Sequence, residues 1–243
     1  MILFFNKFIG MLLQLFPKYV HIKLLNMKAK FFVPVNNHYV SKDLINLSKG
    51  YREPKLYDWL NSIDSNSVFF DVGTNYGQEV TLASSMLEKN IRVVGFDCSL
   101  QASHICALNK KINDDNFQLV FAAVSDKSGE LINISTSSDI HIKSLFKRVI
   151  HYNYDVISLS LDDFSQKQNL APTHLKIDVD GAESKVLKGS TQILKSKTLK
   201  EIYIEIPESQ IHLIKYIESF GFKVKWERTE GKFKEMIFLK SLQ

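Results

Sequence analysis

Short apolar runs alternate with amphipathic stretches along most of the chain. Each apolar run predicts a buried strand, and the stretches between them have the residue spacing of helices. The predicted strands are Val68–Val72, Arg92–Phe96, Gln118–Ala123, Leu175–Val179 and Glu201–Ile206. The predicted helices are Gln78–Lys89, Leu100–Asn113, Ala182–Lys195 and Gln210–Phe220. This order predicts a parallel sheet with helices on both faces.

Two further stretches alternate apolar and polar residues with the period of a strand. The runs Lys223–Arg228 and Glu235–Lys240 flank Gly231 and predict a hairpin at one edge of the sheet. An insertion at about residues 129–161 holds two short alternating runs. Because loops on a rigid sheet carry many binding residues, we expect the insertion to reach the ligand site. Its candidates for contact with a substrate are His141, Lys143, Arg148 and His151.

The first thirty residues do not follow this alternation. They combine many large apolar side chains with lysines and contain no acidic residue; the lysines are Lys7, Lys18, Lys23, Lys28 and Lys30. This composition predicts a helical segment that packs on the core or on a second subunit, or that lies on an anionic membrane surface. The apolar run Phe8–Phe16 is too short to span a bilayer, and no small-residue cleavage site follows it. Neither a transmembrane helix nor a signal peptide is therefore predicted.

Composition limits the fold and the location. A chain of 243 residues with 45% hydrophobic residues is long enough for one α/β domain with a sizeable core. Cys98 and Cys106 form no C-x-x-C pair, which argues against a disulfide framework or a zinc site and favours reduced thiols in the cytoplasm. The net charge of +5 is mild, and we expect no nucleic-acid partner.

The candidate chemistry begins where the first predicted strand ends. Asp71 is followed by a loop between Gly73 and Gly77, whose backbone N–H groups could approach a bound anion. Dinucleotide sites carry G-x-G-x-x-G, whereas this loop has G-x-x-x-G, and Asp71 would repel a pyrophosphate. S-adenosylmethionine fits better, because it offers a carboxylate to the loop and an ammonium group to Asp71. An ordinary tight turn is the alternative.

Acidic residues also follow two other predicted strands. Asp97 lies 24 residues after Gly73, near the offset at which a carboxylate binds the ribose of a nucleoside. Asp178, Asp180 and Glu183 crowd the end of the fourth strand, where like charges raise one another's pKa. If that strand continues to Asp180, Asp178 and Asp180 point to the same side. Such a cluster suits a general base, with a shared divalent ion or a simple helix cap as alternatives.

These blocks, with Phe121–Asp126 and Ile202–Ile206, resemble the FkbM family of S-adenosylmethionine-dependent O-methyltransferases over about Val68 to Glu205. Thr74 stands where the family usually has Ala, Asp97-Cys98 replaces Glu-Pro, and Asp180 replaces Glu. The resemblance implies an α/β class I methyltransferase (Rossmann-like) fold, with a mostly parallel seven-stranded sheet, helices on both faces and an antiparallel edge strand. It also implies a methyltransferase domain at residues 68–243, preceded by a helical segment and linker at residues 1–67 that packs on the core.

The resemblance further implies a site. The cofactor S-adenosylmethionine would contact Asp71, Gly73, Thr74, Asn75, Gly77, Asp97, Cys98, Ala123, Ser125 and Asp178. Asp178, Asp180 and Glu183 would be catalytic, with Asp180 or Glu183 as the base, and no metal is assigned. In this fold the segment before the first strand packs over the cofactor, which places Tyr39, Tyr51, Arg52 or Glu53 near the site.

The implied reaction is methylation of a hydroxyl group of a small molecule or glycan, by a monomer or an oligomer. Two other functions stay open. A nicotinamide-dependent oxidoreductase would use the same loop, although the missing third glycine and Asp71 count against it. A non-catalytic module would keep the fold to bind a membrane or a partner through the basic N-terminal segment.

Overall fold

The computed structural model describes residues 19–34, 37–138 and 150–241. Seven strands form the central sheet, in the order β11-β12-β10-β9-β3-β4-β5. Five of them are parallel: β3 (Val68–Val72), β4 (Arg92–Asp97), β5 (Gln118–Phe121), β9 (His174–Ile177) and β10 (Glu201–Pro207). The hairpin of β11 (Phe222–Glu230) and β12 (Phe233–Lys240) joins antiparallel to β10. This sheet confirms the predicted Rossmann-like fold with its antiparallel edge.

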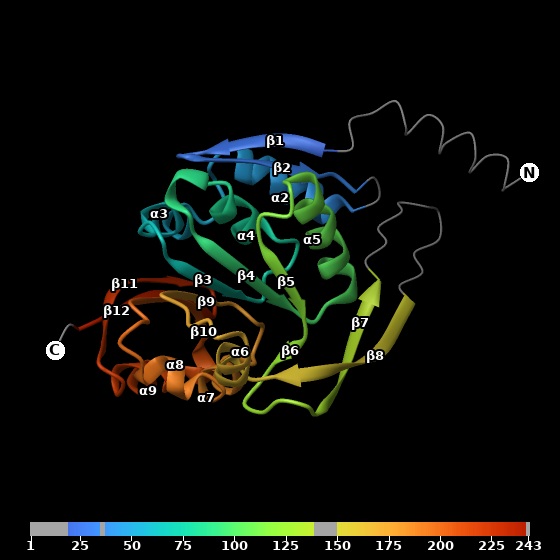
Figure 1. Ribbon diagram of the computed structural model, residues 1–243. Coiled ribbons are helices and arrows are strands. Elements are labelled where there is room, and N and C mark those ends of the chain that lie inside the picture. The colour runs from blue at the N-terminus through green and yellow to red at the C-terminus, as the bar shows by residue number, and fades with distance from the viewer. Residues whose placement is uncertain (1–18, 35–36, 139–149, 242–243) are drawn as a thin grey trace, which may run out of the picture.

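Helices cover both faces of the sheet (Figure 1). One layer holds α2 (His38–Ser48), α3 (Pro54–Ser62), α4 (Gln78–Ser84) and α5 (Leu100–Ile112). The other holds α6 (Leu161–Gln168), α7 (Glu183–Lys188), α8 (Thr191–Lys195) and α9 (Leu213–Glu218). An apolar core lies on each face of the sheet, and successive side chains of a buried strand point alternately into the two cores. Phe69 packs into one core and Phe70 into the other.

Two predicted helices are shorter in the structure. The stretch Gln78–Lys89 becomes α4 and a separate 3-10 turn, Leu87–Lys89. The stretch Ala182–Lys195 is divided between α7 and α8 at Gly189. A Cβ atom at Gly189 would lie 2.1 Å from the carbonyl oxygen of Ser125, so close packing against that carbonyl requires glycine here.

The N-terminal segment differs from the prediction of a helix. Residues 19–32 form an antiparallel hairpin of β1 (Tyr19–Leu24) and β2 (Met27–Phe32), while residues 1–18 lie outside the described residues. The reason is a period of two in this short stretch: Ile22, Met27, Ala29 and Phe31 are buried, and the lysines between them point outward. In place of the predicted linker, residues 37–62 form mainly α2 and α3. The domain boundary at residue 68 stays a prediction.

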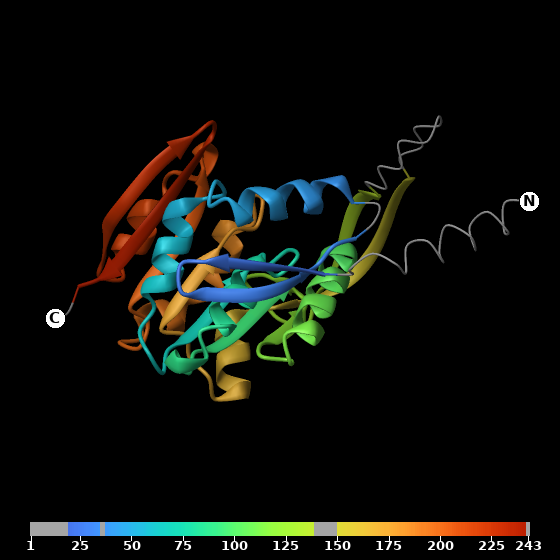
Figure 2. The ribbon, with the colours of Figure 1, turned by 90° about the horizontal axis from the view of Figure 1, so that it is seen from above.

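Side chains of α5 fasten this hairpin to the body of the molecule. The N–H of Phe32 donates to Asn109 Oδ1 at 2.7 Å, and the N–H of Lys30 donates to Asn113 Oδ1 at 2.9 Å. Seen from above, the hairpin crosses the outside of the helix layer below α2 (Figure 2). The hairpin therefore belongs to the folded core while one of its faces stays open to solvent.

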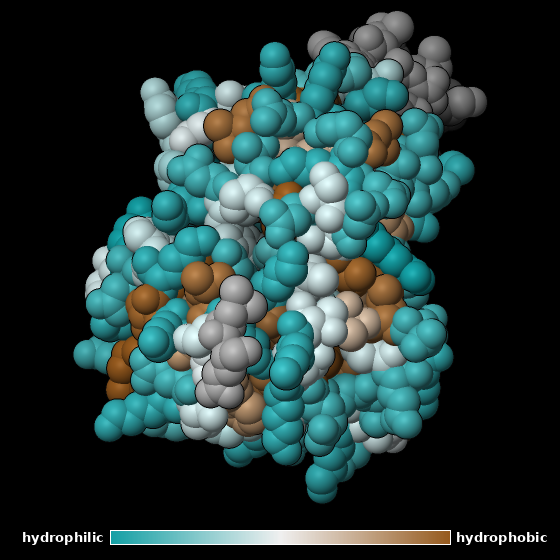
Figure 3. Space-filling model, turned by 60° about the vertical axis from the view of Figure 1, so that its left-hand side comes forward, coloured by the Kyte–Doolittle hydropathy of each residue, from teal (hydrophilic) through white to brown (hydrophobic). Residues whose placement is uncertain are grey.

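The insertion forms an arm beyond the β5 edge of the sheet (Figure 1). It pairs β7 (Leu131–Ser138) with β8 (Ile150–Leu159), and β8 also pairs with the short β6 (Ala123–Val124). His151 lies on β8 and is exposed, whereas His141, Lys143 and Arg148 lie outside the described residues. The opposite side of the molecule, around β11, β12 and α3, is largely hydrophilic, with small separate apolar patches (Figure 3). Within the described residues, no helix is long and apolar enough to cross a bilayer.

Candidate active site

The loop that follows β3 is closed by its own hydrogen bonds. The N–H groups of Gly73 and Thr74 both donate to the carbonyl of Phe96, at 2.9 and 3.0 Å. The N–H of Gly77 donates to the carbonyl of Thr74 at 2.7 Å, and that of Asn75 donates to Asp97 Oδ2 at 2.7 Å. Protein oxygens therefore accept from these four N–H groups in this structure, and the binding of an anion by the loop stays a prediction.

The two glycines of the loop serve close packing. Gly73 has φ +82°, and a Cβ atom there would lie 1.7 Å from the carbonyl oxygen of Asp178. Gly77 has φ +78°, and its Cβ atom would lie 2.4 Å from Cys106 Sγ. Both positions combine a left-handed backbone with a close neighbour, which only glycine satisfies. The loop therefore packs closely against the end of β9 and the middle of α5.

A buried lysine joins the acidic residues that end β3 and β9. Lys176 Nζ lies 3.2 Å from Asp71 Oδ1 and 3.3 Å from Asp178 Oδ2. The Asp71 and Lys176 side chains are fully buried, whereas about a third of the Asp178 side chain is exposed. Burial raises the pKa of Asp71, against the opposing effect of Lys176. Asp71 thus lies beneath the loop, and its contact with a cofactor ammonium group stays a prediction.

Asp97 lies on the other side of the loop, at the end of β4. Its Oδ1 accepts from the N–H of Ser99 at 2.7 Å, while its Oδ2 accepts from Asn75. Burial raises its pKa, with these backbone donors acting in the opposite direction. Each carboxylate oxygen has a second lone pair, and the side chain is half-buried, so it can still accept from a ribose hydroxyl. The residue therefore fits the role predicted for it.

The insertion reaches this turn through one tyrosine. Tyr154 on β8 donates its hydroxyl to the carbonyl of Cys98 at 3.0 Å and accepts from the N–H of Leu100 at 3.0 Å. The Tyr152 ring stacks on the Tyr154 ring, with centroids 6.0 Å apart. Sequence reasoning placed the insertion near the site but did not find Tyr154, because the contact joins residues more than fifty positions apart.

The α2–α3 segment contacts the loop and α4, and its packing over the cofactor stays a prediction. Arg52 pairs with Asp43, which also accepts from Gln78 Nε2 at 3.2 Å. Tyr57 in α3 donates to Glu79 Oε1 at 2.7 Å, and both residues are buried. Among the four predicted residues, Arg52 and Glu53 belong to this charged network, and the Tyr39 ring lies 6.1 Å from that of Tyr76 in the loop. Tyr51 is 76% exposed.

Two glutamates with raised pKa values lie near Asp178. Burial, followed by charges that include Asp178, raises the pKa of Glu53 to about 7, although Arg52 lowers it. Burial and then the Asp178 charge raise the pKa of Glu205 to about 7. Asp178 and Glu205 each directly follow the last register pair of β9 and β10, Ile177 with Ile204. Glu205 was not predicted as a site residue, although its place near the end of a predicted strand was a usable signal.

Several other predicted site residues lie apart from this group. Strand β9 ends at Ile177 and does not continue to Asp180, so the condition for Asp178 and Asp180 to point to the same side is not met; Asp180 is exposed, with φ 49°. Glu183 is buried and accepts from the N–H of Gly181 at 2.8 Å and from Gln210 Nε2 at 2.8 Å. Ser125 contacts β8 and the end of α7, since its N–H donates to Leu159 and its carbonyl packs on Gly189. Within the described residues, no group of three or more metal-binding side chains is placed to hold an ion.

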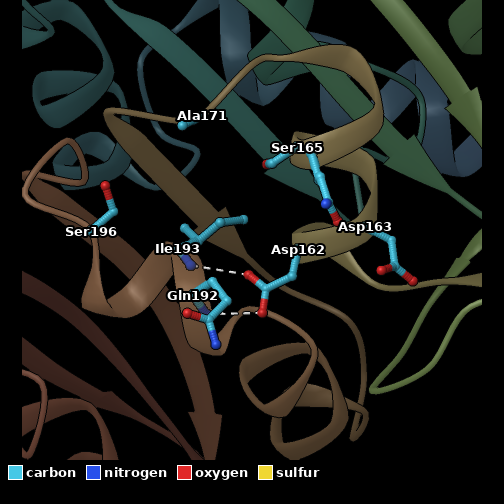
Figure 4. A pocket seen from close by; sticks show the side chains of 8 residues that line it. Asp162, Asp163, Ser165, Ala171, Gln192, Ile193 and Ser196 are labelled. Carbon is cyan, nitrogen blue, oxygen red and sulfur yellow. Dashed lines mark hydrogen bonds between the residues drawn. The ribbon is translucent and has the colours of Figure 1, made fainter.

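A pocket on another part of the surface shows no comparable chemistry (Figure 4). It lies between α6 and α8, beside the segment that leads into β9, and therefore toward the amino ends of the strands. Its lining residues are Asp162, Asp163, Ser165, Gln166, Ala171, Gln192, Ile193 and Ser196. The Asp162 carboxylate accepts from the N–H groups of Gln192 and Ile193 at 2.9 and 3.0 Å. Asp162 therefore holds the first turn of α8 in position. We place the candidate active site at the carboxyl ends of the strands instead.

The chain matches one protein family and is similar to several solved structures. The family model described as Methyltransferase FkbM domain matches residues 71–224. A search among curated proteins found no match. Similar solved structures include a precorrin-6y C5,15-methyltransferase from Geobacter metallireducens GS-15, at 14% identity and a TM-score of 0.48, covering 79% of this chain and 88% of that one. Fibrillarin from Aeropyrum pernix, with bound S-adenosyl-L-methionine, is similar at 10% identity and a TM-score of 0.47, covering 92% and 95%.

Proposed function

The chain belongs to the FkbM family of S-adenosylmethionine-dependent methyltransferases, and from this premise we propose that it methylates a hydroxyl group of a small-molecule or glycan acceptor. One arrangement carries the proposal: Asp97 and Asp178 flank the Gly73–Gly77 loop at the carboxyl ends of three adjacent parallel strands. The strand order reverses at β3, and ligands of open α/β sheets bind at such a reversal.

The residues at this edge divide into two groups. On the β4 side, Asp97 and the backbone of Cys98 would bind the nucleoside half of the cofactor, and Tyr154 holds that turn in position. On the β9 side, Asp178 lies with Glu53 and Glu205, where the acceptor would bind. The reacting atoms would meet between the two groups, above the loop.

S-adenosylmethionine supplies the methyl group and a sulfide leaving group. As the acceptor oxygen bonds to the methyl carbon, the carbon–sulfur electron pair goes to sulfur and the hydroxyl proton must go to a base. We propose Glu205 or Glu53 as this base, because a carboxylate with a pKa of about 7 is suited to take a proton at neutral pH. Glu183 is held by two donors, and Asp180 is exposed, which makes them weaker candidates than the sequence indicated.

The acceptor class and the location remain predictions. A hydroxyl of a small molecule or glycan is implied by the family, and a nucleic-acid acceptor is the rival class. Cys98 and Cys106 are free thiols, which is consistent with the predicted cytoplasmic location.

Calorimetric titration tests the cofactor part of the proposal without knowledge of the acceptor. We expect S-adenosylhomocysteine to bind at micromolar concentration, NADH not to bind, and Asp97→Ala to weaken binding at least about tenfold through loss of its charged hydrogen bonds. Asp58→Ala is the matched control, because Asp58 is an exposed acid on α3. Binding of NADH alone would favour the oxidoreductase, and binding of neither ligand would contradict the enzyme proposal.

A further inference from the structure

The β1–β2 hairpin has one apolar face and one basic face. Ile22, Met27, Ala29 and Phe31 pack into the core with the helices above the sheet. The opposite face carries His21, Lys23 and Lys28, all exposed, and the half-buried Lys30, whose ammonium group lies 5.8 Å from the centre of the Tyr19 ring. Among the described residues, none of these lysines forms an ion pair.

The basic side chains stand directly opposite one another. In the hairpin register, Lys23 pairs with Lys28 and His21 pairs with Lys30. Like charges opposite each other on neighbouring strands are destabilising. This arrangement is unfavourable for the isolated protein, and a negatively charged surface placed against the face would relieve it.

The charge of the chain is concentrated around this hairpin. Residues 1–42 contain six lysines and no Asp or Glu, and the first acidic residue is Asp43. The remainder of the chain holds slightly more acidic than basic residues, so the net charge of +5 comes from this segment. A surface of this sign is complementary to an anionic partner.

The apolar residues of the same segment, residues 1–42, favour one kind of anionic partner, a lipid surface. Residues 1–18, which directly precede β1, include twelve large apolar side chains. On the hairpin itself, Tyr19 and Leu25 are 40% and 46% exposed beside the lysines. Lysines mixed with exposed aromatic and aliphatic side chains suit the headgroup region of a bilayer, where both kinds of side chain are stabilised.

We propose that the outer face of the β1–β2 hairpin docks on an anionic lipid bilayer. The protein would lie with this face on the headgroups, and the helix layer behind the hairpin would face the membrane. Lys23 and Lys28 would supply the electrostatic part of the contact, and Tyr19 and Leu25 the apolar part. The proposal does not depend on the methyl transfer reaction.

Co-sedimentation of the full chain with vesicles tests this docking. One set contains equal parts of phosphatidylglycerol and phosphatidylcholine, and the other contains phosphatidylcholine alone. We expect binding to the anionic set only, weakening as salt is added, because exposed charges are screened. The double variant Lys23→Glu/Lys28→Glu should lower the affinity at least about tenfold through the charge lost near the surface.

A second double variant separates this face from general charge effects. Lys195→Glu/Lys197→Glu makes the same change of charge at exposed positions on the other side of the sheet, and we expect it to bind as the unaltered chain does. The hairpin variant keeps like charges opposite each other, so its melting temperature should stay the same. Equal loss in both variants, undiminished binding of the hairpin variant, or binding of poly-uridylate with none to vesicles would each overturn the proposal.

Discussion

Asp71 and Lys176 are direct partners in the parallel register of β3 and β9. The sequence shows Asp71 at the end of an apolar run, and this position was predicted correctly. Its partner Lys176 could not be predicted, because the two residues are 105 positions apart in the sequence. Only the alignment of β3 with β9 places them side by side. An acid interpreted from sequence as a ligand group is therefore, in the structure, half of a buried ion pair.

Replacement of Lys176 tests how much the Asp71–Lys176 ion pair contributes to stability. We expect Lys176→Met to destabilise the protein by about 3–5 kcal/mol, because it leaves the buried Asp71 carboxylate without its counter-charge. The double variant Asp71→Asn/Lys176→Met should be more stable than Lys176→Met alone. Urea unfolding followed by circular dichroism measures both, and an unchanged midpoint for Lys176→Met would show that the pair does not stabilise the fold.

Glu205 offers a second test at the scale of a residue. Burial and the nearby Asp178 charge raise its pKa to about 7, so it should change from acid to carboxylate in the range where a base must work. Carbon-13 NMR of labelled glutamate should show a titration near neutrality that disappears in Glu205→Gln. Asp178→Asn should move that midpoint to lower pH, because it removes a like charge. A midpoint in the ordinary range for glutamate would contradict the assignment of Glu205 as base.

At the scale of elements, most central strands were predicted to within one residue. The bounds of β3 agree with the sequence prediction, and those of β4 and β10 differ by one residue. The bounds of β9 differ more, because its apolar alternation continues to Val179 while the strand ends at Ile177. The hairpin of β1 and β2 was missed. Its alternation is short and follows a long apolar run, and only packing against α5 decides between strand and helix.

A substitution at Gly77 tests whether close packing of the loop on α5 contributes to stability. Gly77→Ala places a Cβ atom 2.4 Å from Cys106 Sγ in a left-handed backbone, and we expect a loss of about 3 kcal/mol in unfolding free energy. Gly129→Ala is the matched control, because Gly129 has φ +87° and no atom within 4 Å of the added Cβ, so strain alone should cost about 1 kcal/mol. Thermal unfolding compares the two.

A third variant separates the clash at Gly77 from backbone strain. Cys106→Ala removes the sulfur that the new methyl group would meet, so Gly77→Ala should cost less in that background. Equal costs at Gly77 and Gly129 would show that close packing of the loop on α5 does not matter.

At the scale of the whole molecule, charged and polar groups are buried along one face of the sheet. His174 and Lys176 lie two positions apart in β9, below α3, and Asp178 directly follows the end of that strand. Sequence reasoning predicted the three acidic ends of the strands and the family but not this layer. Its members come from α3, β3, β9 and β10, and only the tertiary fold brings them together.

The buried histidine of this layer makes global stability depend on pH. His174 is 4% exposed beside Trp59, its Nδ1 lies 2.9 Å from Thr173 Oγ1, and burial lowers its pKa to about 4. Between its ordinary pKa and about 4, the unfolded chain binds a proton that the folded chain excludes, so this group's contribution to stability falls as pH falls.

Glu53 and Glu205 act in the opposite direction, because their raised pKa values let the folded chain bind protons first. The effect of His174 is therefore visible only as a difference between the unaltered chain and His174→Gln. We expect the unaltered chain to lose about 2–3 kcal/mol more than the variant between neutral pH and pH about 4, from about 1.4 kcal/mol for each pKa unit. Urea unfolding across this range measures it, and parallel curves would mean that His174 is protonated in the folded state.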